Sequence, residues 1–356
     1  MKACAVTVLS LVLATASVAR ADEPAARPLR LMGALQTQGT LVRNFVIDAW
    51  VKPGDGDNQS TVEGWFSGLE DDPPHGAIEG SCVENHCALS ATTSSGKLNI
   101  TGQLLEPKGP IAARFTAKDD DDKVMGQGSA TLNPLTGPIP VLGPLVAPDA
   151  VRAPEFVDLL VWNQLNAPSG DMSDGPIGEM ERDTLADWQS NQSRPGTGLL
   201  FVSDLETLRA GAAAARKTAG WTALGDKAHG WSGGYPAALL PRASRAGAAQ
   251  RFSSTDGKAS LTFVVEGPMT EAAFDALVER ETGDHPERSE VGYNRVNGDM
   301  DVHYQQAGVV HVLAWHNHEG GLARMEFTYP TAASETYDAM GGIIASTFRA
   351  SDDLKP

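Results

Sequence analysis

The sequence lacks a long apolar run, an excess of basic residues and a large set of cysteines, and each lack excludes a class of protein. Its longest apolar stretch, Ala5–Val18, has about 14 residues, short of the roughly 20 that a helix needs to span a bilayer. No later stretch approaches that length. We therefore expect no transmembrane segment in the mature chain.

The first residues have the pattern of a secretory signal peptide. Lys2 gives a basic start, the apolar run follows, and Ala19-Arg20-Ala21 places small residues around a cleavage point. The pattern predicts a signal peptide over residues 1–21, cleaved near Ala21, and a mature protein in the periplasm.

Cysteine is scarce, with three residues in the whole chain, and Cys4 leaves with the signal peptide. Cys82 and Cys87 remain, in a chain directed to an oxidising compartment, so we expect a local disulfide between them. The alternatives are two free thiols or a partial metal site. Two cysteines with His86 give too few ligands at zinc-like spacing.

Basic residues are outnumbered throughout. Loss of Lys2 and Arg20 reduces the 28 Lys and Arg to 26, against 45 Asp and Glu, a formal charge of −19. Nucleic acids and anionic membranes are bound mainly through clustered Lys and Arg, so both are excluded as expected partners. About 335 mature residues exceed the usual size of a single core, which indicates two or three domains.

Residues 30–133 read as an antiparallel β barrel or sandwich, because short strands recur between turn clusters such as Pro53–Asn58 and Ser94-Ser95-Gly96. Asn44–Val51 shows no clean polar face, so the presence of an internal cavity stays open. The expected strands are Leu31–Gln36, Leu41–Val51, Thr61–Gly68, Ala77–Cys82, Cys87–Thr92, Lys97–Leu104, Pro110–Ala117 and Val124–Leu132.

Residues 134–154 form a linker rich in Pro and Gly, a composition that excludes helix and disfavours a central strand. Residues 155–215 then change to a helical period, with apolar positions that include Phe156, Leu160, Leu185 and Trp188.

Residues 220–350 predict an α+β sandwich domain in which helices pack on one antiparallel sheet. The expected helices are Glu271–Arg280 and Ser334–Phe348. The expected strands are Gln250–Ser254, Leu261–Val265, Gly292–Val296, Asp301–Gln306, Val309–His316 and Ala323–Tyr329. The fold class is thus multidomain α+β, with a small three-helix module between two larger parts.

The central segment contains several short motifs in a fixed order. Val161–Asn166 is followed by Asp174–Gly178, then by Trp188-Gln189, then by Thr197-Gly198. Gly178 and Gln189 are eleven positions apart, and Gln189 and Thr197 are eight apart. In order and spacing, this segment resembles the family of three-helix peptidoglycan-binding domains.

The resemblance implies that one set of residues maintains the module's fold, namely Leu165, Gly175, Gly178, Trp188, Thr197 and Gly198. It also implies peptidoglycan as the ligand, contacted by Asn163, Asp174 and Gln189. Departures at Ile177, Glu181 and Thr184 leave open a structural or interaction protein whose module has lost ligand binding.

Peptidoglycan-binding modules are often joined to an enzyme that cleaves the cell wall. We therefore searched the sequence for catalytic residues. Paired cysteines leave no thiol nucleophile. Ser94 and Lys97 fit Ser-x-x-Lys but lie in a turn that contains Gly, and Lys217–Gly220 breaks the Lys-Thr-Gly pattern. We expect no catalytic residue, no cofactor and no enzyme activity; an envelope hydrolase is the alternative.

Histidines gather near the C-terminus, and a metal-dependent hydrolase would use them. His311 and His316 differ by an odd number of positions and so point to opposite faces of a strand. His316 and His318 flank an expected hairpin turn, with Glu319 beside them. These three are the candidate ligands, although a solvated hairpin without metal is the favoured interpretation.

The C-terminal domain also resembles the PsbP type of sandwich, through Trp231–Leu240, the strand after Gly257, and Leu322–Pro330 before a final helix. Such domains are usually non-catalytic, and fold alone does not assign function. The leading hypothesis is a non-catalytic periplasmic protein that binds peptidoglycan through its central module, with an envelope protein as a further partner.

Overall fold

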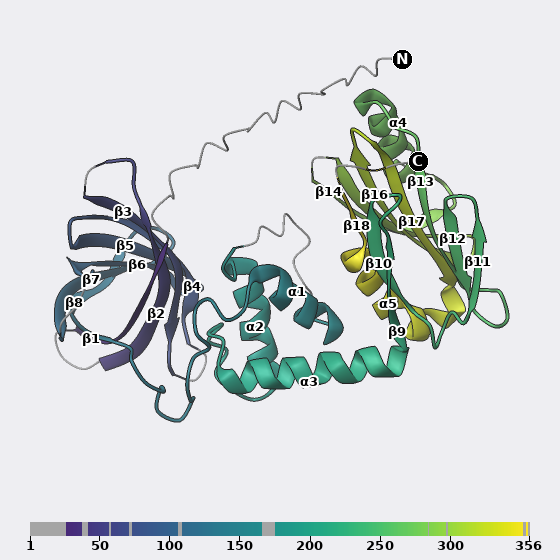
Figure 1. Cartoon of the computed structure of the whole chain (residues 1–356). Coiled ribbons are helices and arrows are strands. Elements are labelled where there is room, and N and C mark those ends of the chain that lie inside the picture. Colours follow the sequence, from purple (N-terminus) through teal and green to yellow (C-terminus); the bar gives the residue numbers. More distant parts are fainter. Residues whose placement is uncertain are drawn as a thin grey trace, which may run out of the picture.

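The computed structural model describes residues 26–37, 42–56, 58–70, 73–105, 109–165, 175–283, 285–296, 298–351 and 354. The predicted signal peptide and its cleavage point lie outside these ranges. A β barrel, a group of three helices and a sheet-rich C-terminal part follow one another along the chain and in space (Figure 1). Within the described ranges, no helix combines the length and apolarity needed to cross a membrane.

The N-terminal part is a closed barrel in which every strand pairs antiparallel with its neighbours in sequence, and β1 closes the ring against β8. Its strands are β1 (Arg27–Thr37), β2 (Val42–Pro53), β3 (Gln59–Gly68), β4 (His75–Val83), β5 (His86–Thr93), β6 (Gly96–Gln103), β7 (Ile111–Lys118) and β8 (Val124–Pro134). All eight predicted strands are present, and the alternative of an open sandwich is wrong.

The barrel interior is a packed hydrophobic core. One side-chain row of each strand points inward, and residues such as Leu31, Ile47, Val62 and Ile100 are almost completely buried there. Eight strands enclose a space just wide enough for side chains to fill. The question of a cavity is thereby answered: apolar side chains occupy the interior.

Cys82 and Cys87 form the expected disulfide, with a Cα–Cα separation of 4.0 Å. They lie directly opposite each other in the β4–β5 hairpin and are buried in the barrel core. Disulfides persist in oxidising compartments, so the bond is consistent with an exported protein.

A segment without regular strands or helices, residues 135–152, connects the barrel to the helices, as the Pro and Gly content predicts. The three helices are α1 (Ala153–Trp162), α2 (Glu179–Asn191) and α3 (Val202–Ala219). Pro154 lies in the first turn of α1, where its missing N–H costs no hydrogen bond. Gly220 ends α3 with φ +60°, a left-handed conformation that glycine adopts without strain.

The C-terminal part contains two antiparallel sheets. The order β11-β12-β13-β17-β16-β15-β14 forms a seven-stranded sheet, and β18-β10-β9 forms a three-stranded one. The strands are β9 (Trp221–Asp226), β10 (Trp231–Pro236), β11 (Arg242–Ala246), β12 (Ala249–Ser253), β13 (Ser260–Glu266), β14 (Arg288–Val296), β15 (Asp299–Gln306), β16 (Val309–His318), β17 (Gly321–Pro330) and β18 (Arg349–Ala350).

Two helices, α4 (Glu271–Thr282) and α5 (Ser334–Thr347), pack on the two faces of the larger sheet. Phe274 of α4 packs with Val302 and Trp315, whereas Ile344 of α5 packs with Val312 and Phe327. A short 3-10 helix, η1 (Thr331–Ala333), precedes α5. Helices and antiparallel strands are both present, as predicted, but they form two sheets where one was expected, and the strands β9, β10, β11 and β18 were not predicted.

Candidate functional site

The helical module is held together by a shared apolar core. Phe156 and Leu160 of α1, Leu185 and Trp188 of α2, and Leu208 of α3 are all buried in it. Trp188 is thus a core residue of the second helix. Ile177, which departs from the family pattern, packs against the same core.

Gln189 organises the loop between α2 and α3. Its Oε1 accepts hydrogen bonds from the backbone N–H groups of Thr197 (2.9 Å) and Gly198 (3.0 Å). Its Nε2 donates to the Leu199 carbonyl (2.9 Å) and to the Asp204 carboxylate (2.8 Å). Gln189, Thr197 and Asp204 are completely buried, so this network is satisfied within the chain.

The loop that Gln189 holds, residues 195–201, lies against the outer wall of the barrel. The indole Nε1 of Trp65 on β3 donates to the Thr197 carbonyl at 2.7 Å. Leu199 and Phe201 are buried with Trp65 and with Val46 of β2. We call this contact, formed by residues 195–201 on β2 and β3, the barrel junction.

An ion pair adds to the barrel junction beside the loop. Arg182 of α2 contacts the Asp48 carboxylate at 2.9 Å, and Arg30 of β1 contacts the same carboxylate at 2.7 Å. Burial raises the pKa of Asp48, but attraction from the two guanidinium groups more than offsets this, so the net shift is downward. Asp48 therefore stays ionised within an apolar surface.

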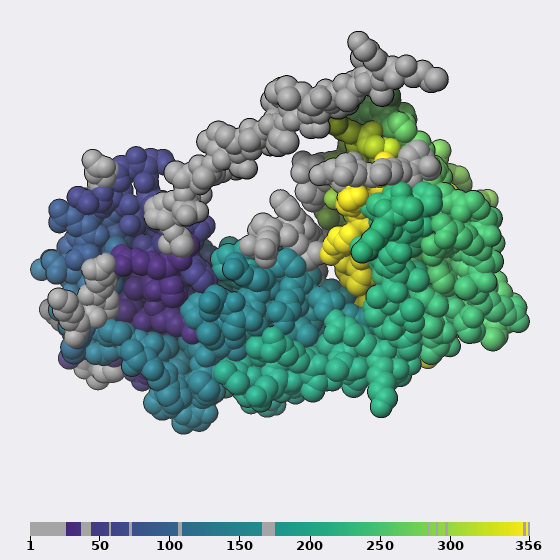
Figure 2. Space-filling view, in the orientation of Figure 1, coloured from purple at the N-terminus to yellow at the C-terminus, as the bar shows by residue number. Residues whose placement is uncertain are grey.

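The other end of the module is packed on the C-terminal part. Trp162 at the end of α1 meets Trp221 of β9 edge to face, with ring centroids 4.9 Å apart. Ile343 of α5 is buried in the module core, and the Arg216 guanidinium lies over the Trp162 ring. The space-filling view shows continuous contact from the barrel through the module to the C-terminal domain (Figure 2).

Two of the three proposed ligand contacts have internal partners. Asn163 donates to the Leu159 and Leu208 carbonyls at 2.8 and 2.9 Å, which ties α1 to α3. Gln189 is completely buried and has no surface to offer a ligand. Their assignment as ligand contacts does not fit these positions. Asp174 lies outside the described residues.

The residues assigned to the module's fold lie in the following places, where they are described. Leu165 packs against the module core, and the Gly175 carbonyl accepts a hydrogen bond from Ala153 at the start of α1. Gly178 precedes α2 with φ −85°, so it does not use the left-handed conformation. Gly198 does use it, with φ +65°.

The solvent-facing side of α2 keeps polar and apolar side chains accessible. Met180 is 59% exposed, and Asp183 and Asp187 are also exposed. Partial desolvation raises the pKa of Asp183; the nearby His75 opposes this shift, and Asp187 adds to it. Met180, Asp183 and Asp187 are thus accessible to solvent on α2.

The barrel has an open groove on its outer wall over β3 to β6. Its lining residues are Thr61, Val62, Glu63, Glu79, Gly80, Ala88, Leu89, Ser90, Asn99 and Thr101. Hydroxyl, amide and carboxylate groups predominate among the exposed side chains of this lining. A ligand of the barrel would therefore bind on its outer wall.

The remaining candidates are distributed as follows. Ser94 lies in the turn between β5 and β6, as predicted from its Gly neighbour. His311 stacks on Tyr304, on the α4 face of the sheet, and His316 packs on Phe348 on the opposite face. Glu319 is exposed in the β16–β17 turn. Sequence reasoning overlooked Asp299, which lies beside His316 and His318.

The barrel junction was also overlooked, although the sequence carries a signal of it. Residues 45–49 of β2 are buried on both faces: Phe45 and Ile47 point into the barrel, while Val46 and Asp48 point toward the helical module. A strand covered on both sides shows no clean alternation of apolar and polar residues. In the sequence, Asn44–Val51 has no clean polar face, and this pattern indicated that both sides of the strand are covered.

No family model matches this sequence, and no curated protein matches it either, so the resemblance of residues 155–215 to peptidoglycan-binding domains gains no support from them. Among solved structures, the chain is similar to the solution structure of cyanobacterial PsbP (CyanoP) from Synechocystis sp. PCC 6803. The identity is 10% and the TM-score 0.29, over 37% of this chain and 92% of that chain. A likeness at this level assigns neither family nor function to the chain.

Proposed function

We propose that the chain is a non-catalytic periplasmic interaction protein whose helical module is a rigid connector between the barrel and the C-terminal domain. The observation that carries this proposal is the barrel junction. Its buried hydrogen bond from Trp65 to Thr197 and its ion pair between Asp48 and Arg182 leave little freedom between barrel and helices. The contact of Trp162 with Trp221 supports the same role at the other end.

The proposed connector would fix the relative position of the surfaces that the two larger domains present to a partner. A flexible linker lets two domains take many separations, whereas a fixed arrangement presents both surfaces at one distance and orientation. The outer groove of the barrel and the exposed surface of the C-terminal domain would then engage one envelope partner together.

Solution scattering of the mature protein tests the connector. Leu199→Asp places a charge in the buried barrel junction, and we expect the barrel to separate from the module and the radius of gyration to increase. Val202→Asp is the matched control, because Val202 is partly exposed at the start of α3. Helical circular dichroism checks that the module stays folded. An unchanged scattering curve for Leu199→Asp would contradict the proposal.

Peptidoglycan binding is the second candidate function, favoured by the order of motifs along α1 to α3. Because Asn163 and Gln189 bond internally, the proposed binding surface moves to the exposed face of α2, around Met180. There an apolar side chain lies beside the carboxylates of Asp183 and Asp187.

Co-sedimentation with purified sacculi tests this candidate. Met180→Ala combined with Asp187→Ala should reduce pelleting several-fold, while Thr101→Ala on the barrel should not. Deleting the whole module is a poor test, since it would expose buried surface on both neighbouring domains. Equal pelleting of the α2 variant and wild type would exclude this surface. Release of soluble fragments from the sacculi would instead favour the hydrolase alternative.

A further inference from the structure

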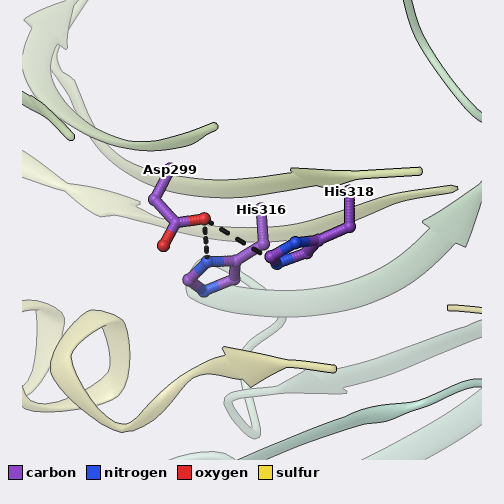
Figure 3. Close-up of side chains that lie close together, drawn as sticks. All are labelled: Asp299, His316 and His318. Carbon is purple, nitrogen blue, oxygen red and sulfur yellow. Dashed lines mark ion pairs between the residues drawn. The ribbon is translucent and has the colours of Figure 1, made fainter. Parts of the chain in front are cut away.

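Three side chains with metal-binding groups converge at one end of the β15–β16 hairpin (Figure 3). Asp299 of β15 is directly opposite His316 of β16, and His318 is two residues further on the same side of β16. One carboxylate oxygen and one nitrogen from each imidazole lie within 4.8 Å of one another. The Asp299 Oδ1 atom is 2.8 Å from His316 Nδ1 and 4.0 Å from His318 Nε2.

The hydrogen bonding around His316 favours a cation between these groups. His316 Nε2 lies 3.3 Å from the Phe348 carbonyl, an acceptor, and from this contact we assign the proton of the neutral ring to Nε2. Nδ1 then presents a lone pair to a carboxylate oxygen 2.8 Å away. Two acceptors at that distance repel each other unless a proton or a metal ion lies between them.

The Asp299 carboxylate also needs a proton or a metal ion as a partner. Oδ1 of Asp299 is buried, and within the described residues its close contact is His316 Nδ1, which satisfies it only when that nitrogen carries a proton. Buried polar atoms without a hydrogen bond are uncommon in folded proteins, and a water molecule or a bound ion is one explanation for them. A histidine that binds metal through one nitrogen commonly donates its other N–H to a backbone carbonyl, as His316 does to Phe348.

We propose that Asp299, His316 and His318 bind one zinc ion. A tetrahedral zinc with bonds of about 2.1 Å holds its ligand atoms roughly 3.4 Å apart, between the 2.8 and 4.0 Å observed here. Small rotations of the side chains would therefore complete the site. Two imidazoles select zinc over magnesium and calcium, which prefer oxygen ligands.

Three protein ligands leave the fourth position to water. The side chains of Asp299 and His318 are 51% and 25% exposed, so solvent reaches the site, while His316 is 14% exposed and fixed against Phe348. Asp301, two residues from Asp299 along β15, adds negative charge, and Arg349 of β18 adds positive charge on the same side.

Isothermal titration of tag-free mature protein with ZnCl₂ tests the site. We expect one equivalent to bind to the wild type, and Asp299→Asn and His318→Ala each to weaken binding at least tenfold. Asp299→Asn keeps the shape of the side chain, so it remains informative if His318→Ala folds poorly. His303→Ala, on the same strand as Asp299, and Glu319→Gln, beside His318, are the matched controls and should bind zinc as the wild type does.

Cobalt substitution gives a second readout. Co²⁺ in the site should show the intense visible absorption of four-coordinate cobalt, and excess Zn²⁺ should remove it, whereas Mg²⁺ should not. Failure of the wild type to bind zinc would overturn the proposal and leave a proton-mediated pair of Asp299 and His316. Equal weakening in His303→Ala or Glu319→Gln would also overturn it, because the zinc would then be bound elsewhere.

Discussion

At the scale of single residues, Asp48 shows that tertiary contacts decide whether a carboxylate is solvated or buried. A carboxylate on the middle of a barrel strand looks like a solvated outer residue in the sequence, yet it is buried and contacts Arg30 and Arg182. Breaking one side of a buried ion pair leaves an uncompensated charge, at a cost of about 3–5 kcal/mol. The barrel junction thus depends on one acidic side chain.

This carboxylate makes the stability of the protein depend on pH. The pKa of Asp48 is lower in the folded state than its ordinary value, so its contribution is complete above about pH 4. It is lost as the pH falls through the folded-state pKa, because the unfolded chain takes up the proton first. Urea unfolding at pH 6 and at pH 3 should show a smaller acid loss in Asp48→Asn than in wild type. Equal losses would contradict the assignment.

Gly198 is the other residue on which the barrel junction depends. Its φ is +65°, and a Cβ atom there would lie 2.8 Å from the Trp65 ring. We expect Gly198→Ala to lower the free energy of unfolding by roughly 1–3 kcal/mol, through backbone strain and displacement of the indole.

Gly137→Ala is the control for Gly198, since nothing lies within 4 Å of a Cβ atom at that position. The control should change the free energy of unfolding by less than about 0.5 kcal/mol. Thermal and urea denaturation measure both variants. A similar effect at the two glycines would show that the conformation and close packing of Gly198 do not matter.

The role of a residue could be predicted when it depends on residues close to it in sequence, and not when it depends on distant ones. The pairing of Cys82 with Cys87 followed from compartment and count, and the core position of Trp188 followed from helical period. Gln189 was interpreted as a ligand contact from the resemblance, and its internal partners lie eight or more residues away in sequence, where no local pattern indicates them. Asp299 was overlooked because strand pairing places it beside His316.

At the scale of elements, the eight barrel strands were predictable because turn clusters separate short runs of β-forming residues. The predicted helices of the C-terminal domain were also found, at Glu271–Thr282 and Ser334–Thr347. Strand β11, Arg242–Ala246, is exposed along its whole length, and β18 has two residues. Neither carries an apolar pattern, so pairing with neighbouring strands defines both.

The β4–β5 hairpin offers an element-scale prediction. Its disulfide closes a short loop, for which the chain-entropy relation gives a stabilisation of about 2 kcal/mol. Cys82→Ala combined with Cys87→Ala should lose that amount in urea unfolding while the barrel stays folded. Wild type treated with a reductant should lose a similar amount. An unchanged unfolding midpoint in both cases would contradict the prediction.

At the scale of the whole molecule, the linker proved to be part of the structure. Residues 135–152 contain no regular helix or strand, as predicted, but Ile139 is buried on the barrel wall. Leu145 pairs with Phe201 in an isolated bridge, and Val146 donates a backbone hydrogen bond to Leu200. Composition predicted an extended chain, and tertiary contacts that composition does not encode fixed its path.

Helix α3 spans the distance between the two larger domains along one side of the molecule (Figure 1). Eighteen residues make it roughly 27 Å long, and each added residue would lengthen it by about 1.5 Å and turn its end by about 100°. The length and rotational phase of α3 therefore matter more to the arrangement of the two domains than its exposed side chains do. A mutational scan should find exposed positions such as Glu206, Ala213 and Ala214 tolerant of substitution and intolerant of single-residue insertion.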